Sequence, residues 1–502
     1  MMNKLILSTF LICQVAWLTG QNSLTPDYTF GDSGKVQLPT RIHHLLEHPN
    51  GLIIVLGSSD ILALLPNGSL APNFGSGGIA SLYGTINAYQ GICLQSDGKI
   101  LVVGNRSGDI IVERFAPDGG RDLLFGQNGK VTIDNQSQSD QGCGITVDEK
   151  GRILVCGYTT QLGGKSNMVV ARLLTDGTLD PTFSSNGVLT IDFGGVGTCW
   201  AYDIVSTIRE KILIAGGVSM PSSSKHTSDF AVVRINNNGT LDTSFDFDGR
   251  KAIDFGLRDD FARKINIKND GKILLTGRSY IDNIDFGLAQ LNPDGSLDHT
   301  FSFDGRANIG ISTGDEEGYT TSLQPDGKLI IAGYETTTVN KFALVRLLPD
   351  GQVDLSFENF GSFVDDIGNQ KAYSMLLQQI AINDYRIIMG GTQGTVTAYR
   401  ISNIGTSTSL DDMNASLNSY VKLFPNPVET NTFTLEVSEL GSGKILLIDL
   451  QGKVLLAKEF QPITKEGQEL IFSLPSWLMN GMYQLVLETD QVQGTIPFHV
   501  LR

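Results

Sequence analysis

The segment His44-Leu45-Leu46-Glu47-His48 has the residue types and order of a zinc site, H-x-x-E-H. That pattern holds one metal ion only on a helix, because residues four apart share a helix face. Here Pro49 and Asn50 follow at once, and aligning Gly51 with Gly98 places the histidines in a strand that leads into a turn. In a strand His44 and His48 would lie about 13 Å apart. We therefore expect no zinc site at these residues.

Two acidic turns and one glycine-rich turn have the composition of ion-binding loops. Asp246-Phe247-Asp248-Gly249 and Phe303-Asp304-Gly305 offer carboxylates that suit calcium, but they lack the further ligands and terminal Glu of an EF-hand loop. They are typical of Asx turns, and calcium stays an open alternative. Gly163-Gly164-Lys165-Ser166 matches the end of a phosphate loop, but Thr159 stands where the first glycine is required. From the sequence as a whole we assign no catalytic, cofactor-binding or metal-binding residue.

An arginine followed eight residues later by an aspartate recurs along the chain. A ring of such arginines could bind anions, whereas each pair could instead fasten one connection through a charge-assisted hydrogen bond. Repetition favours the structural role, because a binding site generally breaks a repeat. The four pairs of this predicted latch are Arg114 and Asp122, Arg172 and Asp180, Arg234 and Asp242, and Arg346 and Asp354.

These pairs belong to a repeat that runs through residues 24–401. Each unit has an aromatic anchor after a turn and an apolar run of five or six residues that ends in glycine, such as Lys272–Gly277. The runs are rich in β-branched residues and leucine, which is typical of a strand buried on both faces. The seven anchors are Phe30, Phe74, Phe125, Phe183, Phe245, Phe301 and Phe357.

A further strand of each unit, such as Asp229–Ile235, carries the recurrent arginine and is followed by turn residues. Arg400 also fills this position, whereas Ala63 and Gln290 replace the arginine in two units. In the first six units the anchor lies 11 residues after this position. So constant a spacing indicates a rigid connection.

About four short strands in each of seven units of about 56 residues predict an all-β, seven-bladed β-propeller over residues 21–403. The last unit ends near Arg400 without an anchor of its own, while residues 24–36 supply an anchor with no unit before it. We expect this N-terminal segment to lie beside the final strand and close the ring.

The units resemble the delta-60 repeat family of β-propellers. The family pattern, Leu-Asp-x-x-Phe followed later by Asp-Gly-Lys-Ile and an arginine strand, is matched best at residues 178–357, and the resemblance covers about 375 residues. The first unit departs from the pattern at Asn50 and Ala63. The chain has no Trp-Asp dipeptide of the WD type. The resemblance implies the propeller fold and leaves the ligand open.

The composition narrows the class of protein. The 502 residues include 53 Asp+Glu against 37 Lys+Arg, a net charge of −16, and 41% are hydrophobic. The length exceeds one ordinary core. The acidic balance excludes a general nucleic-acid binder or a protein held on anionic lipid by a basic face. Residues 1–20 have the pattern of a secretory signal peptide, and we expect no transmembrane segment in the rest of the chain.

Four cysteines follow the predicted signal peptide, too few for a disulfide scaffold. If Glu149 and Lys150 form a two-residue hairpin turn, Cys143 and Cys156 lie opposite each other. A disulfide between them and a pair of buried free thiols are both left open. Cys93 and Cys199 have no evident partner.

Residues 404–418 are polar and without periodicity, as in a linker, and residues 419–502 predict the short strands of a small β-sandwich. Three motifs in this last segment resemble, in order, the type A C-terminal sorting domain of type IX secretion in Bacteroidetes. The resemblance implies the type IX machinery as a partner and passage across the outer membrane, with cleavage or surface attachment to follow. The motif residues are Phe424, Pro425, Asn426, Pro427, Asp449, Gly452, Lys453, Gly481 and Tyr483.

Repeat and sorting motifs together predict a protein that is secreted or held on the outer-membrane surface and that binds a glycan or a protein. The alternative is a secreted enzyme, such as a hydrolase, with its site at the mouth of the propeller channel. Departures from the repeat are the better indication of a binding site. They concentrate in two longer loops, Thr159–Asn167 and Val218–Ser228, which we expect between the third and fourth strands, counted from the anchor, of neighbouring units. Nearby Trp200 and Tyr202 offer a stacking surface, with core packing as their preferred role.

Overall fold

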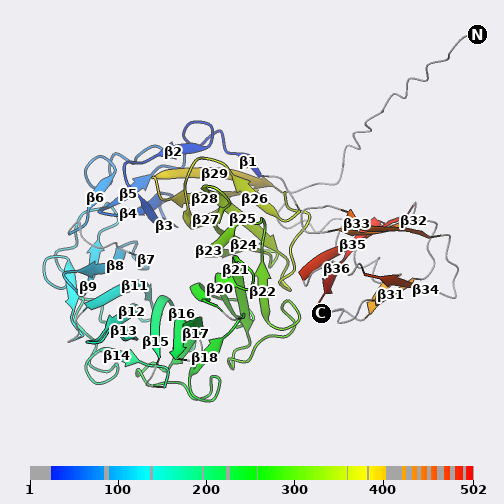
Figure 1. Cartoon of the computed structure of the whole chain (residues 1–502). Coiled ribbons are helices and arrows are strands. Elements are labelled where there is room, and N and C mark those ends of the chain that lie inside the picture. The colour runs from blue at the N-terminus through cyan, green and yellow to red at the C-terminus, as the bar shows by residue number, and fades with distance from the viewer. Residues whose placement is uncertain are drawn as a thin grey trace, which may run out of the picture.

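The computed structural model describes residues 24–402, apart from 84–89, 136–138, 195–196, 222–225, 257, 359 and 382–383, together with seven strands between residues 421 and 500. Seven antiparallel sheets stand around a central axis as the blades of a β-propeller (Figure 1). The predicted all-β class and seven-bladed propeller are therefore confirmed. The described residues contain no helix, and so none that could cross a membrane. The predicted signal peptide, residues 1–20, and linker, residues 404–418, lie outside the described residues.

Six blades each consist of four consecutive strands, with the first strand nearest the axis. Blades 1 to 3 are β3 (Ile42–Glu47), β4 (Ile53–Gly57), β5 (Asp60–Leu64) and β6 (Ile79–Ser81); β7 (Gly91–Leu94), β8 (Ile100–Arg106), β9 (Asp109–Phe115) and β10 (Lys130–Ile133); and β11 (Ser139–Val147), β12 (Ile153–Thr160), β13 (Ser166–Leu173) and β14 (Val188–Ile191). Blades 4 to 6 are β15 (Thr198–Ser206), β16 (Ile212–Pro221), β17 (His226–Ile235) and β18 (Arg250–Ile253); β19 (Phe261–Ile267), β20 (Ile273–Tyr280), β21 (Ile284–Leu291) and β22 (Arg306–Ile309); and β23 (Asp315–Leu323), β24 (Leu329–Thr336), β25 (Asn340–Leu347) and β26 (Ser362–Asp365).

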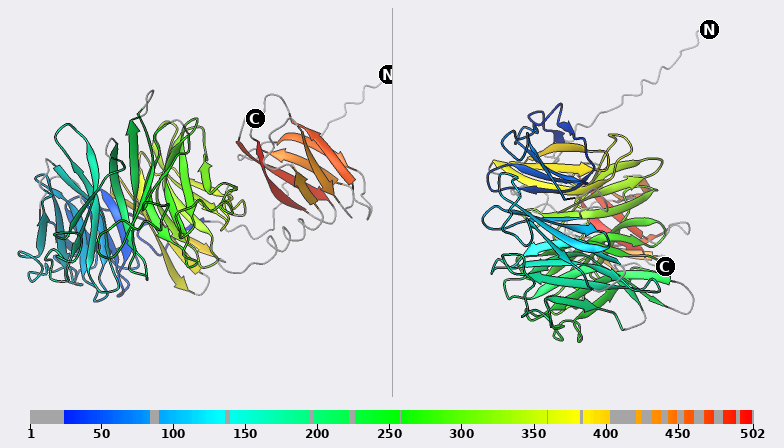
Figure 2. Two further views of the ribbon diagram at one scale, coloured as in Figure 1. Left: turned by 90° about the horizontal axis from the view of Figure 1, so that it is seen from below. Right: turned by 90° about the vertical axis from the view of Figure 1, so that its left-hand side faces the viewer.

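The strands of every blade run between two faces of the propeller (Figure 2). Hairpins between the second and third strands lie at one face, where the inner strands also begin; we call it the hairpin face. The turns that follow the third strands, and the latch, lie at the opposite face.

Apolar side chains of the middle strands pack each blade on the next. In β12 the residues from Ile153 to Gly157 are all buried, as predicted for a strand covered on both faces. The anchor Phe125 is buried against Gly177 of the following blade, where a Cβ would come within 2.8 Å of the ring. Gly177 also has a φ of +90°, which glycine adopts at little cost. Anchor and turn glycine thus hold neighbouring blades together.

The seventh blade draws on both ends of the propeller segment. It contains β27 (Ala372–Ala381), β28 (Asp384–Gly391) and β29 (Thr395–Ser402) from the end of that segment. From its beginning, β1 (Leu24–Pro26) and β2 (Lys35–Gln37) pair antiparallel with β29. The anchor Phe30 between them is fully buried. The predicted ring closure is confirmed.

The C-terminal segment forms two antiparallel sheets. One contains β30 (Val421–Phe424), β31 (Thr432–Val437) and β34 (Gln468–Ser473), and the other contains β33 (Val454–Phe460), β32 (Gly443–Ile448), β35 (Gly481–Thr489) and β36 (Gln493–Val500). Packing of the two as a sandwich stays a prediction. Phe424 ends β30, and Gly481 and Tyr483 lie in β35. The other predicted motif residues lie outside the described residues: Pro425, Asn426, Pro427, Asp449, Gly452 and Lys453.

Candidate functional site

The inner strands of six blades contain a β-bulge at equivalent places. In β11 the pairing shifts between Gly142 and Gly144, which leaves Cys143 as the extra residue. A bulge bends its strand and redirects one side chain. The extra residues of the other five blades are His43, Tyr202, Arg263, Tyr319 and Tyr373. All six line a cavity on the propeller axis, as does Gln90, which precedes β7.

A glycine on the second strand makes room for the bulge. A Cβ on Gly157 would lie only 1.8 Å from the carbonyl oxygen of Gln141, and Gly277 repeats this relationship with Phe261. No side chain is compatible with such a distance. The glycine that ends the apolar run is therefore required by the bulge, and in five of the six bulged units it lies 14 residues after the bulge residue.

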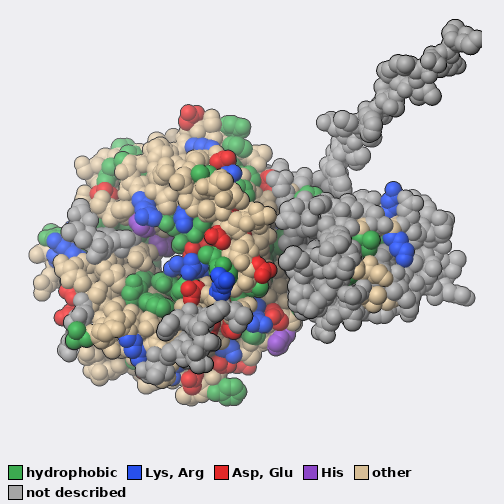
Figure 3. Space-filling view, in the orientation of Figure 1, with side chains coloured by type: hydrophobic (Ala, Val, Ile, Leu, Met, Phe, Trp, Pro, Cys, Tyr) green, Lys and Arg blue, Asp and Glu red, His purple; other side chains and the backbone are tan. Residues whose placement is uncertain are grey.

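The cavity has a volume of about 490 Å³ and is lined by residues of all seven inner strands. Figure 3 shows the opening at the axis with Lys and Arg side chains beside it. A concave space of this size suits a small molecule or a short stretch of a polymer, whereas protein partners usually meet over broad surfaces.

Arg263 is the central cation of the lining. Its guanidinium lies 4.6 Å from the ring centroid of Tyr202 and 5.5 Å from that of Tyr319. Its Nε lies 2.9 Å from Oε1 of Glu317. Burial alone would lower the pKa of Arg263, but the charge and hydrogen bond of Glu317, together with Tyr202 and Tyr319, outweigh burial, so that the pKa is raised. Arg263 is therefore a fixed positive charge with aromatic rings beside it.

Tyr319, Tyr334 and Tyr373 form a second group, here called the tyrosine cluster. The ring of Tyr319 meets that of Tyr373 edge-on at 4.7 Å and lies 6.1 Å from that of Tyr334. The ring of His43 is nearly parallel to that of Tyr373 at 6.4 Å. Tyr319, Tyr373 and His43 are partly exposed, so their rings remain accessible from the cavity.

The two cavity histidines are uncharged at neutral pH. Burial, followed by the charges of His44 and Arg41, lowers the pKa of His43 to about 4. Burial and then Lys264 lower the pKa of His44 to about 4 as well. Each ring can then donate one hydrogen bond and accept another, as neutral imidazole does.

The remaining titratable groups of the lining are tied to partners or held protonated. Asp203 pairs with Lys264 at 2.9 Å. Burial and the charge of Glu317 raise the pKa of Tyr319 far above its ordinary value. Burial raises the pKa of Cys143 to about 12. Hydrogen-bond donors, aromatic faces and cations dominate, and these groups bind ligands well but are poorly matched to proton transfer near pH 7.

The His44 to His48 segment forms the predicted strand, β3, with His48 just beyond its end. His44 lines the cavity, whereas His48 is buried with its Nε2 2.8 Å from the carbonyl oxygen of Gly98. The two histidines lie in different surroundings.

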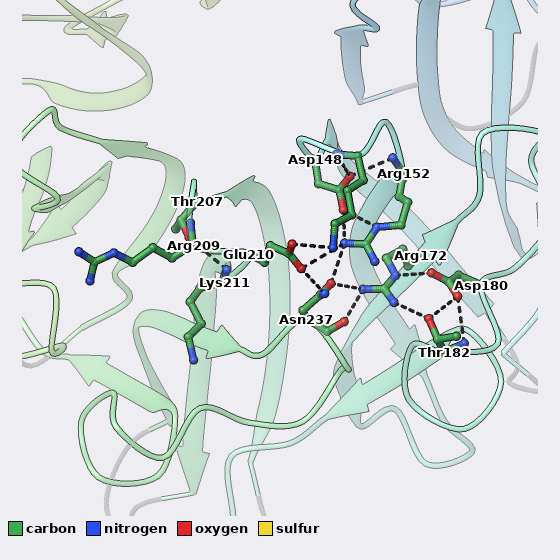
Figure 4. Close-up of polar contacts among 11 residues, drawn as sticks. Asp148, Arg152, Arg172, Asp180, Thr182, Thr207, Arg209, Glu210, Lys211 and Asn237 are labelled. Carbon is green, nitrogen blue, oxygen red and sulfur yellow. Dashed lines mark hydrogen bonds and ion pairs between the residues drawn. The ribbon is translucent and has the colours of Figure 1, made fainter.

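Each of the four predicted latch pairs is an ion pair at the opposite face. Nε of Arg172 lies 2.8 Å from Oδ2 of Asp180, and its guanidinium lies 4.7 Å from the anchor ring of Phe183 (Figure 4). Arg172 also donates to the carbonyl oxygen of Asn237 in the next blade. These contacts support the proposed structural role. The other pairs join Arg114 to Asp122 at 2.9 Å, Arg234 to Asp242 at 2.7 Å and Arg346 to Asp354 at 2.8 Å.

A wider hollow of about 740 Å³ surrounds this latch. Its polar groups bind one another: Arg152 donates to Oδ1 of Asn237 at 2.7 Å, and Glu210 pairs with Lys150 at 2.6 Å (Figure 4). We assign no ligand to this hollow.

The loops singled out from the sequence join the strand of the apolar run to the arginine strand in two neighbouring blades, the connection at which they were expected. Thr159–Asn167 spans the hairpin between β12 and β13, and Val218–Ser228 spans the hairpin between β16 and β17. Residues 222–225 lie outside the described residues. Tyr202 lines the cavity, whereas Trp200 contacts Phe261 edge-on at 6.0 Å.

The disulfide considered for Cys143 and Cys156 is not formed; both are free cysteines. The bulge shifts the pairing by one residue, so that Gly144 stands opposite Cys156. Cys93 and Cys199 are free as well.

The carboxylates of the turns considered for calcium have cationic partners. Asp246 pairs with Lys251 at 3.0 Å, and Asp304 with Arg306 at 2.8 Å. Away from these turns, at the hairpin face, two groups of aspartates bring carboxylate oxygens within 4.8 Å of one another: Asp109, Asp134 and Asp140, and Asp229, Asp254 and Asp260. Acidic groups alone do not define a metal site, and we assign none.

Segments of both the propeller and the C-terminal part match known protein families. Five segments match the family described as "Domain of unknown function (DUF5122) beta-propeller": residues 95–125, 151–183, 211–245, 268–301 and 324–357. Residues 422–497 match the secretion system C-terminal sorting domain. The chain contains DUF5122 β-propeller repeats and a type IX C-terminal sorting domain. The sorting domain indicates export to the cell surface or the medium.

No curated protein matches this chain. Among solved structures, it is similar to the streptogramin B lyase, with 12% identity over 74% of this chain and 96% of the other and a TM-score of 0.47. An ulvan lyase gives 9% identity over 76% and 99% of the two chains and a TM-score of 0.42. The extracellular domain of a one-component system of B. thetaiotaomicron gives 11% identity and a TM-score of 0.38; the match covers 95% of this chain but only 58% of that one. We draw nothing about activity from these neighbours.

Proposed function

We propose that this exported propeller is a carbohydrate-binding protein and that its ligand enters the central cavity from the hairpin face. The observation that carries the proposal is the set of bulge residues, one histidine, one cysteine, one arginine and three tyrosines, which all line one cavity although the repeat around them is regular. Side chains that vary within an otherwise regular repeat are released from its packing constraints.

The chemistry of the lining supports a sugar as the ligand. Tyrosine faces pack against the apolar faces of sugar rings, while hydroxyls, neutral imidazoles and guanidinium groups hydrogen-bond to sugar hydroxyls. Tyr319, Tyr373 and His43 provide such groups within one cavity. The concave shape favours a saccharide over the protein ligand that the sequence also left open.

A secreted enzyme with its site in the same cavity is the second candidate. His43 and His44 beside the tyrosines favour it, because imidazole and phenol are common acid–base groups. Their pKa values, about 4 for both histidines and raised for Tyr319, disfavour proton transfer at neutral pH. Binding is therefore the function that the site supports better.

The test is a saccharide array probed with the purified full chain, followed by titration of each positive saccharide. Tyr319→Ala and Tyr373→Ala should each weaken binding about tenfold or more, since an aromatic contact contributes on the order of 1 kcal/mol beyond its buried area. Tyr280→Ala, at a tyrosine outside the cavity lining, is the matched control and should bind like the original chain. Failure to bind any saccharide would overturn the proposal. Cleavage of a bound saccharide would favour the enzyme.

A further inference from the structure

Positive charge gathers around the tyrosine cluster although the protein as a whole is acidic. The cations are Arg41, Arg278 and Lys371, here called the cationic rim. Arg41 lines the cavity, Lys371 lies beside Tyr334, and Arg278 lies beside Glu317. The guanidinium of Arg41 lies 5.1 Å from the ring centroid of Tyr373, and its Nη2 donates to the Tyr373 hydroxyl at 2.6 Å. The ammonium of Lys371 lies 3.8 Å from the ring centroid of Tyr334. The cations are thus held on aromatic faces.

Acidic groups do not balance this charge. Glu317 is already engaged by Arg263 at 2.9 Å and by the Tyr334 hydroxyl at 3.1 Å, and it lies 4.0 Å from Nη1 of Arg278. Within the described part of the chain, neither Arg41 nor Lys371 forms an ion pair, and the buried Nε of Arg278 has no hydrogen-bond acceptor. Among the described residues, the rim therefore has positive charges without an acidic partner and an N–H donor without an acceptor.

The titration of Lys371 agrees with this geometry. Burial lowers its pKa, and the positive charges of Arg41 and Arg278 lower it further, although Glu317 and Asp315 act in the opposite direction. Asp315 is exposed at the start of β23. An anion placed near Arg41 and Lys371 would relieve the repulsion between the like charges.

We infer that the ligand is an anionic saccharide, whose carboxylate or sulfate group binds the cationic rim while its sugar rings contact the tyrosine cluster. This inference rests on the proposed carbohydrate function and names the class of sugar. Guanidinium groups suit both anions, because two parallel N–H donors match two oxygens of a carboxylate or a sulfate. A neutral saccharide would leave the rim charges uncompensated in a partly desolvated site.

The experiment titrates the purified full chain with three probes of equal length: tetragalacturonate, a sulfated carrageenan tetrasaccharide and neutral cellotetraose. We expect at least one anionic probe to bind about tenfold or more tightly than the neutral one, which corresponds to a single charge-assisted contact. Binding should weaken as the salt concentration rises, because salt screens exposed charges. The probe preferred among the two anions tells whether the group is a carboxylate or a sulfate.

Arg41→Gln and Lys371→Gln locate the site. Each should reduce the affinity for the anionic probe toward that for the neutral probe. Arg258→Gln is the matched control, because Arg258 also stacks on a tyrosine, at 4.5 Å from Tyr280, and donates to its hydroxyl at 2.8 Å, but this tyrosine does not belong to the tyrosine cluster. Tyr373→Phe keeps the ring and removes only the hydroxyl, and it should retain most of the binding.

The outcomes separate the two proposals. Equal binding of neutral and anionic probes would overturn this inference and leave carbohydrate binding intact. Anion-selective binding that survives both rim substitutions would also overturn it, because the anion would then bind elsewhere. If none of the saccharides of the array binds, the proposed function fails and this inference fails with it.

Discussion

Asp27, near the start of the propeller, forms an ion pair with Arg400 in its last strand, with 3.1 Å between Oδ1 and Nε. The same carboxylate lies 3.3 Å from Nη1 of Arg386, which also donates to the carbonyl oxygen of Pro66 in the first blade. Asp27 is fully buried. One N-terminal carboxylate thus joins the two ends of the ring, in the position that a latch aspartate takes elsewhere.

Replacing Asp27 with alanine should destabilise the closed ring. Loss of one partner from a buried ion pair costs on the order of 3–5 kcal/mol, because the guanidinium of Arg386, which is almost completely buried, stays desolvated. The measurement is urea unfolding of the purified chain. Asp32→Ala, at an exposed carboxylate in the same segment, serves as control and should change the stability by no more than about 0.5 kcal/mol. Equal effects of the two substitutions would contradict the importance of this pair.

The same carboxylate predicts sensitivity to acid. Burial raises the pKa of Asp27, but hydrogen bonds from Thr29 and the charge of Arg400 outweigh it, so that the pKa lies below its ordinary value. The stabilisation is therefore present above about pH 4 and is lost as the pH falls further. Asp27→Ala should consequently destabilise the chain less at pH 3 than at pH 7. An effect independent of pH would contradict the ion pair.

Arg172→Ala should weaken the contact between the third and fourth blades. Arg172 and Asp180 are both almost completely buried, so we expect a loss of about 3–5 kcal/mol in the free energy of unfolding. Arg209→Ala, at an exposed arginine of the same hollow, is the control and should be nearly neutral. Arg172→Gln should be milder, because Gln290 in the fifth blade donates to Asp298 at 2.6 Å. If Arg172→Gln lowered the free energy of unfolding as much as Arg172→Ala, the comparison with Gln290 would be contradicted.

Buried carboxyl groups between the fifth and sixth blades predict that stability falls as the pH rises from about 4 to about 8. Burial and the neighbouring Asp285 raise the pKa of Glu316 to about 8, and burial raises that of Asp285 to about 6. Glu335 on the adjacent strand adds a further like charge. Between about pH 4 and pH 8 the folded chain therefore binds more protons than the unfolded chain, and its stability falls as the pH rises.

Glu316→Gln should flatten this dependence, measured as urea midpoints at pH 5, 6.5 and 8. Asp315→Asn changes an exposed carboxyl on the same strand and should leave the slope as it is. An unchanged slope in Glu316→Gln would show that other groups cause the dependence.

Removing residues 419–502 should stop export at the outer membrane. The shortened chain should accumulate in the periplasm, whereas the full chain reaches the surface or the medium, as fractionation would measure. The control is the full-length gene, expressed in the same strain and from the same promoter as the shortened gene. Surface display of the shortened chain would contradict the role of the sorting domain.

The features that every unit repeats could be predicted from the sequence. Phe125 and its equivalents, and pairs such as Arg172 and Asp180, meet the same packing constraint in each blade and so recur at constant spacing. Closure of the ring by residues 24–37 could also be predicted, because Phe30 is an anchor with no repeat unit before it.

The candidate site could not be predicted in the same way. Tyr373 and Arg263 belong to no local motif, because six blades contribute one bulge residue each and only the closed ring brings these residues together. One signal was present: the glycine that ends each apolar run, such as Gly277, stands opposite the bulge. The bulge also explains why Cys143 does not stand opposite Cys156, as the hairpin spacing had predicted. The extra residue shifts the pairing, so that Gly144 stands opposite Cys156.

Closure by the N-terminal strands also sets an order of events during export. A chain that passes a membrane pore from its N-terminus delivers β1 and β2 first and β29 last, so the blades already outside can only form an open arc. Contacts between such distant segments are slow to form and come late in folding. The propeller can be completed only when residues up to Ser402 have emerged, shortly before the sorting domain itself. A translation product that stops before β29 would therefore lack both the closed ring and the signal for the outer membrane.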